Sequence, residues 1–334
     1  MSRRVDAASA PGKMMIAGEY AVLEGAEAVV AAVDRRTRVT FTPASASAAI
    51  GSPEFGSAAT VISPPLEVSS THAAVAARLG PVPGTLRVDA SALQQGGKKL
   101  GLGSSAANAA ATAGLLLRAH GRDLRDPQER ALALELALEG HRAVAPQGSG
   151  ADVAASVLGG FVRFRRLGDG VETHALDWPS ALRSVVVWTG ARGEPPRTSH
   201  FVAKVNALAA SEPQRHRGLM GALAAESERF IWALAAHELS EIIECFHAFG
   251  TAMGNLGTAA GVPIVDSQIS SVRELAQSCG GAAKPSGAGG GDVALALFSS
   301  DDEAAAFRGR CAERGFEVLS IELGVPGERD EEQS

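Results

Sequence analysis

Cysteines, long apolar runs and a signal sequence are scarce or missing in this chain of 334 residues. Its three cysteines, Cys245, Cys279 and Cys311, lack metal-ligand spacing, which excludes a disulfide framework and is typical of a reducing cytosol. No stretch reaches the roughly 18 uninterrupted apolar residues of a membrane-spanning helix. The first ten residues include two arginines but no apolar signal core. We therefore expect a cytoplasmic protein without a membrane partner.

The sequence also lacks a surplus of basic charge. Its formal net charge is −6 and its pI is near 5.8. Short basic runs such as Arg35, Arg36 and Arg38 do not make the extended patch that nucleic-acid binding needs. An anionic ligand must then be held locally, by a few cations and backbone N–H groups. We expect a small-molecule ligand and no nucleic acid.

Several catalytic signatures are missing as well. The chain has no G-x-x-x-x-G-K-[ST] loop, no G-x-S-x-G turn and no dinucleotide fingerprint, which disfavours P-loop enzymes, α/β-hydrolases and dinucleotide-binding proteins. Its eight histidines show no zinc-ligand spacing with each other or with cysteine.

Glycine is abundant, with 38 residues, and three glycine-containing segments stand out, 10–20, 98–107 and 284–292. Glycine lets the backbone approach a bound group closely. Only five of the 31 basic residues are lysines, and four of the five lie in these segments: Lys13, Lys98, Lys99 and Lys284. A compact ammonium fits between phosphate oxygens in a way that a guanidinium does not. The three segments are therefore predicted to bind phosphates.

The second segment, 98–107, predicts a glycine loop that leads into an alanine-rich helix. The first N–H groups of such a helix point at an anion, and the serine hydroxyls can add a ligand for Mg²⁺. A plain glycine turn with serine caps is an equally good interpretation of this segment alone.

The remaining pattern predicts a mixture of helices and strands without strict alternation, which is typical of α+β proteins. Strands are expected within 13–33 and at 37–42, 161–165, 185–188, 292–298 and 316–323. Helices are expected at 126–142, capped by Asp126, and at 213–253 and 266–278. Residues 43–70 suggest a long loop or lid. We expect an N-terminal lobe at 1–180, a C-terminal lobe at 181–327 and a flexible tail at 328–334.

In this order, the three segments resemble the motifs of the galactokinase, homoserine kinase, mevalonate kinase and phosphomevalonate kinase (GHMP) superfamily. The resemblance implies an N-terminal α/β lobe, a ferredoxin-like C-terminal lobe, and ATP and substrate in the cleft between them. Within the superfamily, the sequence most resembles phosphomevalonate kinases at 18–22, 99–105, 147–152, 187–190 and 284–292. That likeness implies ATP, Mg²⁺ and phosphomevalonate as ligands, in a monomer or homodimer.

The resemblance also implies the site residues. Lys13 and Asp152 would be catalytic, and Ser104 and Ser105 would bind Mg²⁺. The implied ATP-binding residues are Lys99, Gly101, Leu102, Gly103, Ser104, Ser105 and Ala106. The implied substrate-binding residues are Lys13, Glu19, Tyr20, Ser149, Gly150, Thr198, Ser199, Lys284, Ser286, Gly287, Ala288 and Gly289.

Three alternatives remain open. The chain could be a mevalonate kinase or another small-alcohol kinase of the superfamily, although mevalonate kinases more often have histidine where this chain has Tyr20. Their magnesium-binding glutamate falls at His141 here, which leaves serine, water and nucleotide phosphates for the ion. The chain could also be a non-catalytic nucleotide-binding regulator with the same fold, because a fold does not determine function. Asp152 could also be the N-cap of a helix that begins near Val153.

Overall fold

The computed structural model describes residues 7–43, 64–95, 98–168, 170–190, 198–291 and 293–331. The first lobe is built on a six-stranded antiparallel sheet in the order β12-β1-β2-β6-β7, with β3 also paired to β2. Its strands are β1 (Ala7–Ala17), β2 (Ala28–Pro43), β3 (Gly84–Asp89), β6 (Phe161–Leu167), β7 (Gly170–Leu176) and β12 (Arg329–Asp330).

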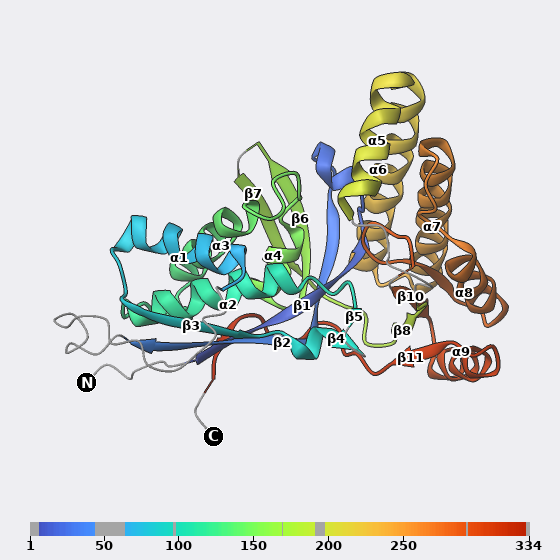
Figure 1. The fold of residues 1–334 in the computed structure, drawn as a ribbon. Helices are drawn as coiled ribbons and strands as arrows, with labels where there is room; N and C mark the ends of the chain where they lie inside the picture. Colours follow the sequence, from blue (N-terminus) through green and yellow to red (C-terminus); the bar gives the residue numbers. More distant parts are fainter. Residues whose placement is uncertain are drawn as a thin grey trace.

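Four helices cover this sheet in two layers, the inner pair on its strands and the outer pair on the inner helices (Figure 1). They are α1 (Leu66–Leu79), α2 (Ser104–Ala119), α3 (Pro127–Arg142) and α4 (Ala151–Leu158). Helix α2 is the central one, and every residue from Ala106 to Leu117 is buried. Its alanines let the neighbouring helices and the sheet approach closely, because a methyl side chain takes up little room. Short elements, η1 (Ala21–Glu24), η3 (Ser91–Leu93), β4 (Gln94–Gln95) and β5 (Lys98–Lys99), connect the larger ones.

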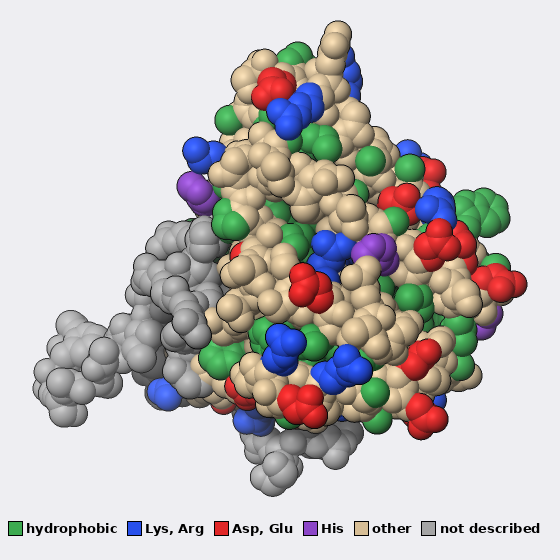
Figure 2. Space-filling view, turned by 90° about the vertical axis from the view of Figure 1, so that its right-hand side faces the viewer, with side chains coloured by type: hydrophobic (Ala, Val, Ile, Leu, Met, Phe, Trp, Pro, Cys, Tyr) green, Lys and Arg blue, Asp and Glu red, His purple; other side chains and the backbone are tan. Residues whose placement is uncertain are grey.

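The second lobe has a four-stranded antiparallel sheet in the order β11-β8-β10-β9. The strands are β8 (Arg183–Trp188), β9 (Ala282–Pro285), β10 (Val293–Phe298) and β11 (Glu317–Leu319). The helices are α5 (Thr198–Ser211), α6 (Pro213–Ala236), α7 (Leu239–Ala260), α8 (Ser267–Ser278) and α9 (Asp301–Glu313). Figure 2 shows basic and acidic side chains interspersed on the face of this lobe.

Strand β10 is buried along its whole length because both of its faces are covered. Ala294, Ala296 and Phe298 pack with residues of α8 and α9, whereas Leu295 and Leu297 belong to the core that continues into the first lobe. A strand that is buried on both sides is expected to be apolar throughout, which explains the sequence Val-Ala-Leu-Ala-Leu-Phe.

The α+β expectation is confirmed, and the helix starts follow local capping chemistry. Asp126 accepts a hydrogen bond from the N–H of Gln128 at the start of α3, and Asp266 accepts one from Ile269 at the start of α8. The predicted run 213–253 is divided into α6 and α7 by His237, which has a left-handed φ of 57°. The proposed boundary near residue 180 stays a prediction.

Two expectations about loops and ends are wrong in part. The predicted loop at 43–70 ends earlier, because α1 begins at Leu66, while residues 44–63 lie outside the described residues. The tail expected from residue 328 is ordered at its start. Glu328 is 3% exposed and accepts a hydrogen bond of 2.9 Å from Arg118, and the next two residues pair with β1 as β12. No helix in the described ranges is long and apolar enough to span a membrane.

Candidate active site

Strand β1 contains most of the first glycine segment, and one of its edges contacts both the second and the third segment. The N–H of Lys13 donates to the carbonyl of Leu102 in the second segment at 2.8 Å. Two residues further on, the N–H of Met15 donates to Ser286 Oγ at 3.0 Å, and that hydroxyl donates to the Met15 carbonyl at 3.1 Å. Backbone groups two residues apart point to the same edge of a strand. The second and third segments are therefore attached to neighbouring positions of one strand.

The Lys13 side chain lies between these two segments. A Cβ atom added to Gly103 would stand 2.9 Å from both Cγ and Cε of Lys13, so the side chain passes directly over the Gly103 backbone. A Cβ atom added to Gly287 would stand 3.9 Å from Lys13 Nζ. Three predicted site residues, one from each segment, therefore meet around one ammonium group.

Gly103 is also the N-cap of α2, with a left-handed φ of 76° and no side chain that could satisfy the first N–H groups of the helix. Ser104 and Ser105 follow in the first turn and are partly exposed, whereas Leu102 and Ala106 are buried on either side of them. The buried pair fixes the loop to the core. The start of α2 presents its dipole and its serines beside Lys13.

His141 joins the N-termini of α2 and α4; the sequence placed it at the position of a magnesium-binding glutamate but predicted no contact for it. Its Nε2 lies 3.1 Å from Ser105 Oγ and 3.8 Å from Asp152 Oδ2, and the residue is 4% exposed. The sequence signal for these contacts was the short distance along the chain between two segments. Glu139–Arg142 ends one predicted helix, and Gly148 to Asp152 begins the next.

Asp152 lies inside the first turn of α4 and is not its cap. The helix begins at Ala151 and its N-cap is Gly150, which has a left-handed φ of 88°. Asp152 Oδ1 accepts from the N–H of Val153 at 3.0 Å, and Ser149 Oγ accepts from the N–H of Ala151 at 3.2 Å. The interpretation of Asp152 as an N-cap is wrong, because glycine takes that position and leaves Oδ2 facing His141.

Lys284 and Glu19 form a buried ion pair between the lobes. Lys284 is 0% exposed, and its Nζ donates to Glu19 Oε1 and to the Pro285 carbonyl, the latter at 2.9 Å. The rings of Phe246 and Phe249 each lie 5.5 Å from this ammonium. Burial lowers the pKa of Lys284, an effect that Glu19 opposes and the Lys13 charge reinforces.

The third segment is held by Glu19 and Tyr20 together. Glu19 Oε1 also accepts from the N–H of Gly287 at 3.2 Å, and the Tyr20 hydroxyl donates to the Ala288 carbonyl at 2.5 Å. Burial, and then the Glu19 charge, raises the pKa of Tyr20, so the hydroxyl keeps its hydrogen. Glu19, Tyr20 and Lys284 were predicted to bind substrate, but their polar atoms are directed at the protein, where they shape the third segment.

The other predicted residues differ in their surroundings. Lys99 and Gly101 are exposed, and Thr198 and Ser199 begin α5 as exposed residues. Gly289 is tightly packed, since a Cβ atom there would stand 2.2 Å from the Ile264 carbonyl. Asp292 and the side chain of Lys98 lie outside the described residues. The ligand contacts of all these residues stay predictions.

The residues present fit a small hard cation that also binds phosphates. No group of three or more His, Cys, Asp or Glu residues that could hold a metal occurs in the part of the chain that the structure describes. Ser105 Oγ and Asp152 Oδ2, however, both lie within 4.0 Å of the same His141 nitrogen. Mg²⁺ usually takes only one or two protein oxygens and completes its shell with water and substrate phosphates.

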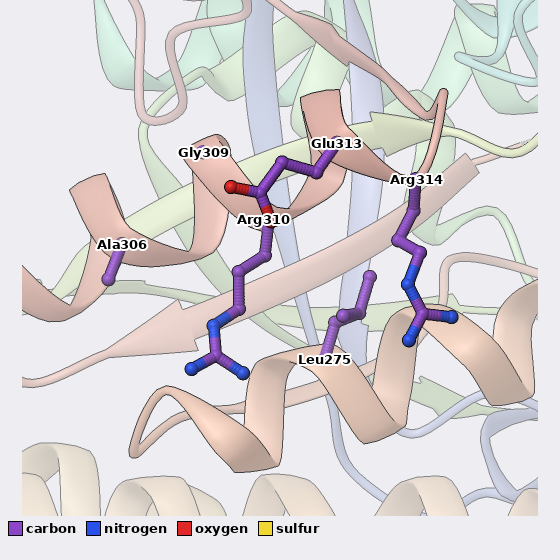
Figure 3. A pocket seen from close by; sticks show the side chains of 6 residues that line it. All are labelled: Leu275, Ala306, Gly309, Arg310, Glu313 and Arg314. Carbon is purple, nitrogen blue, oxygen red and sulfur yellow. The ribbon is translucent and has the colours of Figure 1, made fainter.

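A cavity of about 440 Å³ lies elsewhere, between α8 and α9 on the second lobe (Figure 3). Arg310 lines it from α9, Arg314 from the residue that follows α9, and Leu275 from α8. Arg310 donates to Ser278 Oγ at 3.0 Å, at the carboxyl end of α8, where a basic side chain is favourable. None of its lining residues belongs to the glycine segments, so this cavity is separate from the Lys13 site.

Comparison with known proteins identifies the family. Residues 69–160 match the GHMP kinases N terminal domain, and residues 230–316 match the GHMP kinases C terminal domain. The chain is 28% identical to a phosphomevalonate kinase of Streptomyces sp. (strain CL190), over 87% of this chain and 89% of that protein. It is 32% identical to a mevalonate kinase of Aeropyrum pernix, over 62% and 63% of the two chains.

A solved structure of Streptococcus pneumoniae phosphomevalonate kinase, in complex with phosphomevalonate and AMPPNP, has the same fold. Its TM-score is 0.77 at 21% identity, covering 95% of this chain and 99% of that one. The N-terminal and C-terminal family models match in this order along the chain, and the resemblance inferred from the sequence is confirmed. The chain belongs to the GHMP kinase family.

Proposed function

We propose that this protein transfers the γ-phosphoryl group of ATP to the phosphate of 5-phosphomevalonate, giving 5-diphosphomevalonate and ADP. The convergence of Lys13, Gly103 and Gly287 is the observation that carries the proposal, since it gathers an ammonium and two glycine backbones around one point. The choice of acceptor is supported by the likeness to the Streptomyces enzyme along nearly the whole chain. GHMP kinases use ATP, and the Streptococcus structure contains an ATP analogue.

Lys13 has the central role in this reaction. An oxygen of the acceptor phosphate forms a bond to the γ-phosphorus while the bond from that phosphorus to the β-phosphate oxygen breaks. Two anionic groups must be brought into line, and the main barrier that the protein can lower is their repulsion. The Lys13 ammonium, next to the N-terminus of α2 and the third segment, offsets that charge.

Asp152 has a smaller role with this acceptor than with an alcohol. A phosphate monoester has a second pKa of about 6, so it is already an anion at neutral pH and needs little help from a base. Asp152 then acts through the groups next to it, the N-terminus of α4 and His141. With an alcohol acceptor, the same carboxylate would have to remove a proton.

Ser104, Ser105 and Asp152 are the residues that would hold Mg²⁺ together with the nucleotide phosphates. Bound Mg²⁺ supplies positive charge on the phosphate oxygens and thereby favours transfer. Asp152 and the two serines stand in the first turns of α4 and α2, so these helix starts also direct N–H groups toward the phosphates.

Mevalonate kinase is the second candidate, favoured by the 32% identity to the Aeropyrum enzyme. Coupled ADP release with each acceptor decides between them. We expect kcat/KM for phosphomevalonate to exceed that for mevalonate by at least about 100-fold, the discrimination that one well-placed charged contact gives. A higher kcat/KM with mevalonate would identify the protein as a mevalonate kinase instead. No ADP release with any acceptor would indicate a nucleotide-binding regulator.

A further inference from the structure

His141 is a buried imidazole at the point where three helix ends meet. It lies in the last turn of α3, beside Ser105 in the first turn of α2 and Asp152 in the first turn of α4. It is 4% exposed, although the serine that it contacts is partly open to the site. A buried polar side chain with a hydrogen bond to a predicted ligand-binding group has more than a packing role.

The distances define what this imidazole can bind. Nε2 is within hydrogen-bond distance of Ser105 Oγ, at 3.1 Å, but its 3.8 Å separation from Asp152 Oδ2 is too long for a hydrogen bond. A serine hydroxyl has one hydrogen and two lone pairs. When a neutral imidazole accepts that hydrogen at Nε2, both lone pairs of Ser105 stay available for another partner.

We propose that His141 is a positioning residue that accepts the Ser105 hydroxyl hydrogen and thereby commits Ser105 to a divalent cation rather than to a phosphate oxygen. A cation ligand must offer a lone pair, whereas a phosphate contact must donate the hydrogen. Were Nε2 to carry the hydrogen instead, Ser105 Oγ would accept it and its own hydrogen would be free to bind phosphate. The two arrangements predict different effects of Mg²⁺.

The inference rests on the nucleotide part of the proposed function and not on the identity of the acceptor. It is therefore tested by ADP binding, measured by titration calorimetry with Mg²⁺ and with EDTA. Five proteins are compared: the wild type, His141→Leu, His141→Gln, Ser105→Ala and the double variant His141→Leu/Ser105→Ala. Leucine fills similar space without an acceptor, whereas the glutamine amide places an oxygen near the Nε2 position.

Mg²⁺ lowers the Kd for ADP by a certain factor in the wild type, and we expect that factor to be about 10-fold smaller in His141→Leu. Residues that hold metal ligands in place typically contribute 10–100-fold to metal affinity. Its Kd for ADP in EDTA should stay within about 2-fold of the wild type. His141→Gln should retain most of the Mg²⁺ effect. In the double variant with Ser105→Ala, His141→Leu should add nothing, because the two residues act as one unit.

Equal weakening of ADP binding with and without Mg²⁺ would overturn the inference, as would full additivity in the double variant. Should His141→Leu fail to fold, His141→Asn replaces it, because the shorter amide does not reach the Nε2 position. Absence of ADP binding in the wild type is a different result. It would refute the nucleotide-binding proposal itself.

Discussion

Glu19 Oε1 accepts both the Lys284 ammonium and the N–H of Gly287, so one carboxylate oxygen connects an interlobe ion pair to the third glycine segment. Both side chains are at most 2% exposed. Pairing in such a place gives little net stability, because both charges lose their water. Its effect is geometric: it fixes Gly287 next to Lys13 Nζ.

Removing one partner of this pair is expected to be costly. Lys284→Met leaves the Glu19 carboxylate buried and unpaired, which should lower the free energy of unfolding by about 3–5 kcal/mol. Denaturant unfolding followed by circular dichroism measures the loss. The matched control is Arg78→Met, which removes an ion pair with Glu135 whose side chains are 48% and 57% exposed, and which should leave the denaturation midpoint nearly unchanged.

The double variant Glu19→Gln/Lys284→Met separates charge from packing. It removes both charges and keeps an oxygen for the N–H of Gly287, so it should recover at least half of the stability that Lys284→Met loses. If the double variant is no more stable than the single one, the unpaired charge is not the cause.

Gly103→Ala should abolish most activity through Lys13. The added Cβ would stand 2.9 Å from two Lys13 carbons and would displace the ammonium, and a misplacement of about 1 Å can cost about 100-fold in rate. Gly121→Ala is the matched control, because Gly121 has the same φ of 76° but nothing within 4 Å of the added methyl. Both variants should lose about 1–2 kcal/mol of stability from backbone strain.

ADP release and thermal unfolding of the two variants make the comparison. A similar loss of activity in both would mean that strain, and not the contact with Lys13, accounts for the effect of Gly103→Ala.

Local signals predicted the fold well where they were strong. Asp126 with Pro127, and Asp266, marked the starts of two helices within a residue of their observed positions. Helix α9 was missed even though Ser300 caps it: Ser300 Oγ accepts from Glu303 N, and the Glu303 carboxylate accepts from the N–H of Ser299, the residue before the cap. Its buried face consists of Ala304, Phe307 and Cys311, of which only Phe307 is large, so the apolar periodicity of the sequence is weak.

The candidate site was predicted less completely, because its contacts join residues far apart in the chain. The glycine segments and their lysines were visible as a pattern, but burial was not. Lys284 and Lys13 look alike in the sequence, yet one ammonium is fully buried against Glu19 and the other reaches Gly103 and Gly287. The sequence placed His141 at the position of a magnesium-binding glutamate, but its contacts depend on three helix ends meeting, which no local pattern shows.

Two buried thiols should make the protein less stable in alkaline solution. Burial raises the pKa of Cys245 from 9.0 to about 12 and that of Cys311 to about 11. A group whose pKa is raised by folding stabilises the fold below its unfolded pKa and loses that contribution as pH rises toward its folded pKa. Stability should therefore fall above pH 9.

Denaturant unfolding at pH 8 and pH 10 tests this expectation. The wild type should lose about 1 kcal/mol more between these values than Cys245→Ala, which has one fewer buried thiol. Cys279→Ala, in which the half-exposed cysteine is removed, is the control and should lose as much as the wild type. Identical losses in Cys245→Ala and the wild type would contradict the assignment.

Lys13 and Asp152 should respond differently to the choice of acceptor. Lys13→Met removes the charge that offsets phosphate repulsion, so kcat should fall by about 100- to 1,000-fold whichever acceptor is used. Asp152→Asn should cost only about 10-fold with phosphomevalonate, because that acceptor is already ionised at pH 7. With mevalonate, where a proton must be removed, the same substitution should cost about 100-fold or more.

Single-turnover rates with both acceptors measure this difference, because they report transfer without ADP release. His174→Gln is a suitable control, since His174 is exposed on β7 and, within the described ranges, its side chain interacts with Glu172 on the same strand. Equal and total loss in Lys13→Met and Asp152→Asn with phosphomevalonate would mean that Asp152 acts as an obligatory base even for an ionised acceptor. The division of roles between the two residues would then be wrong, although both would remain in the site.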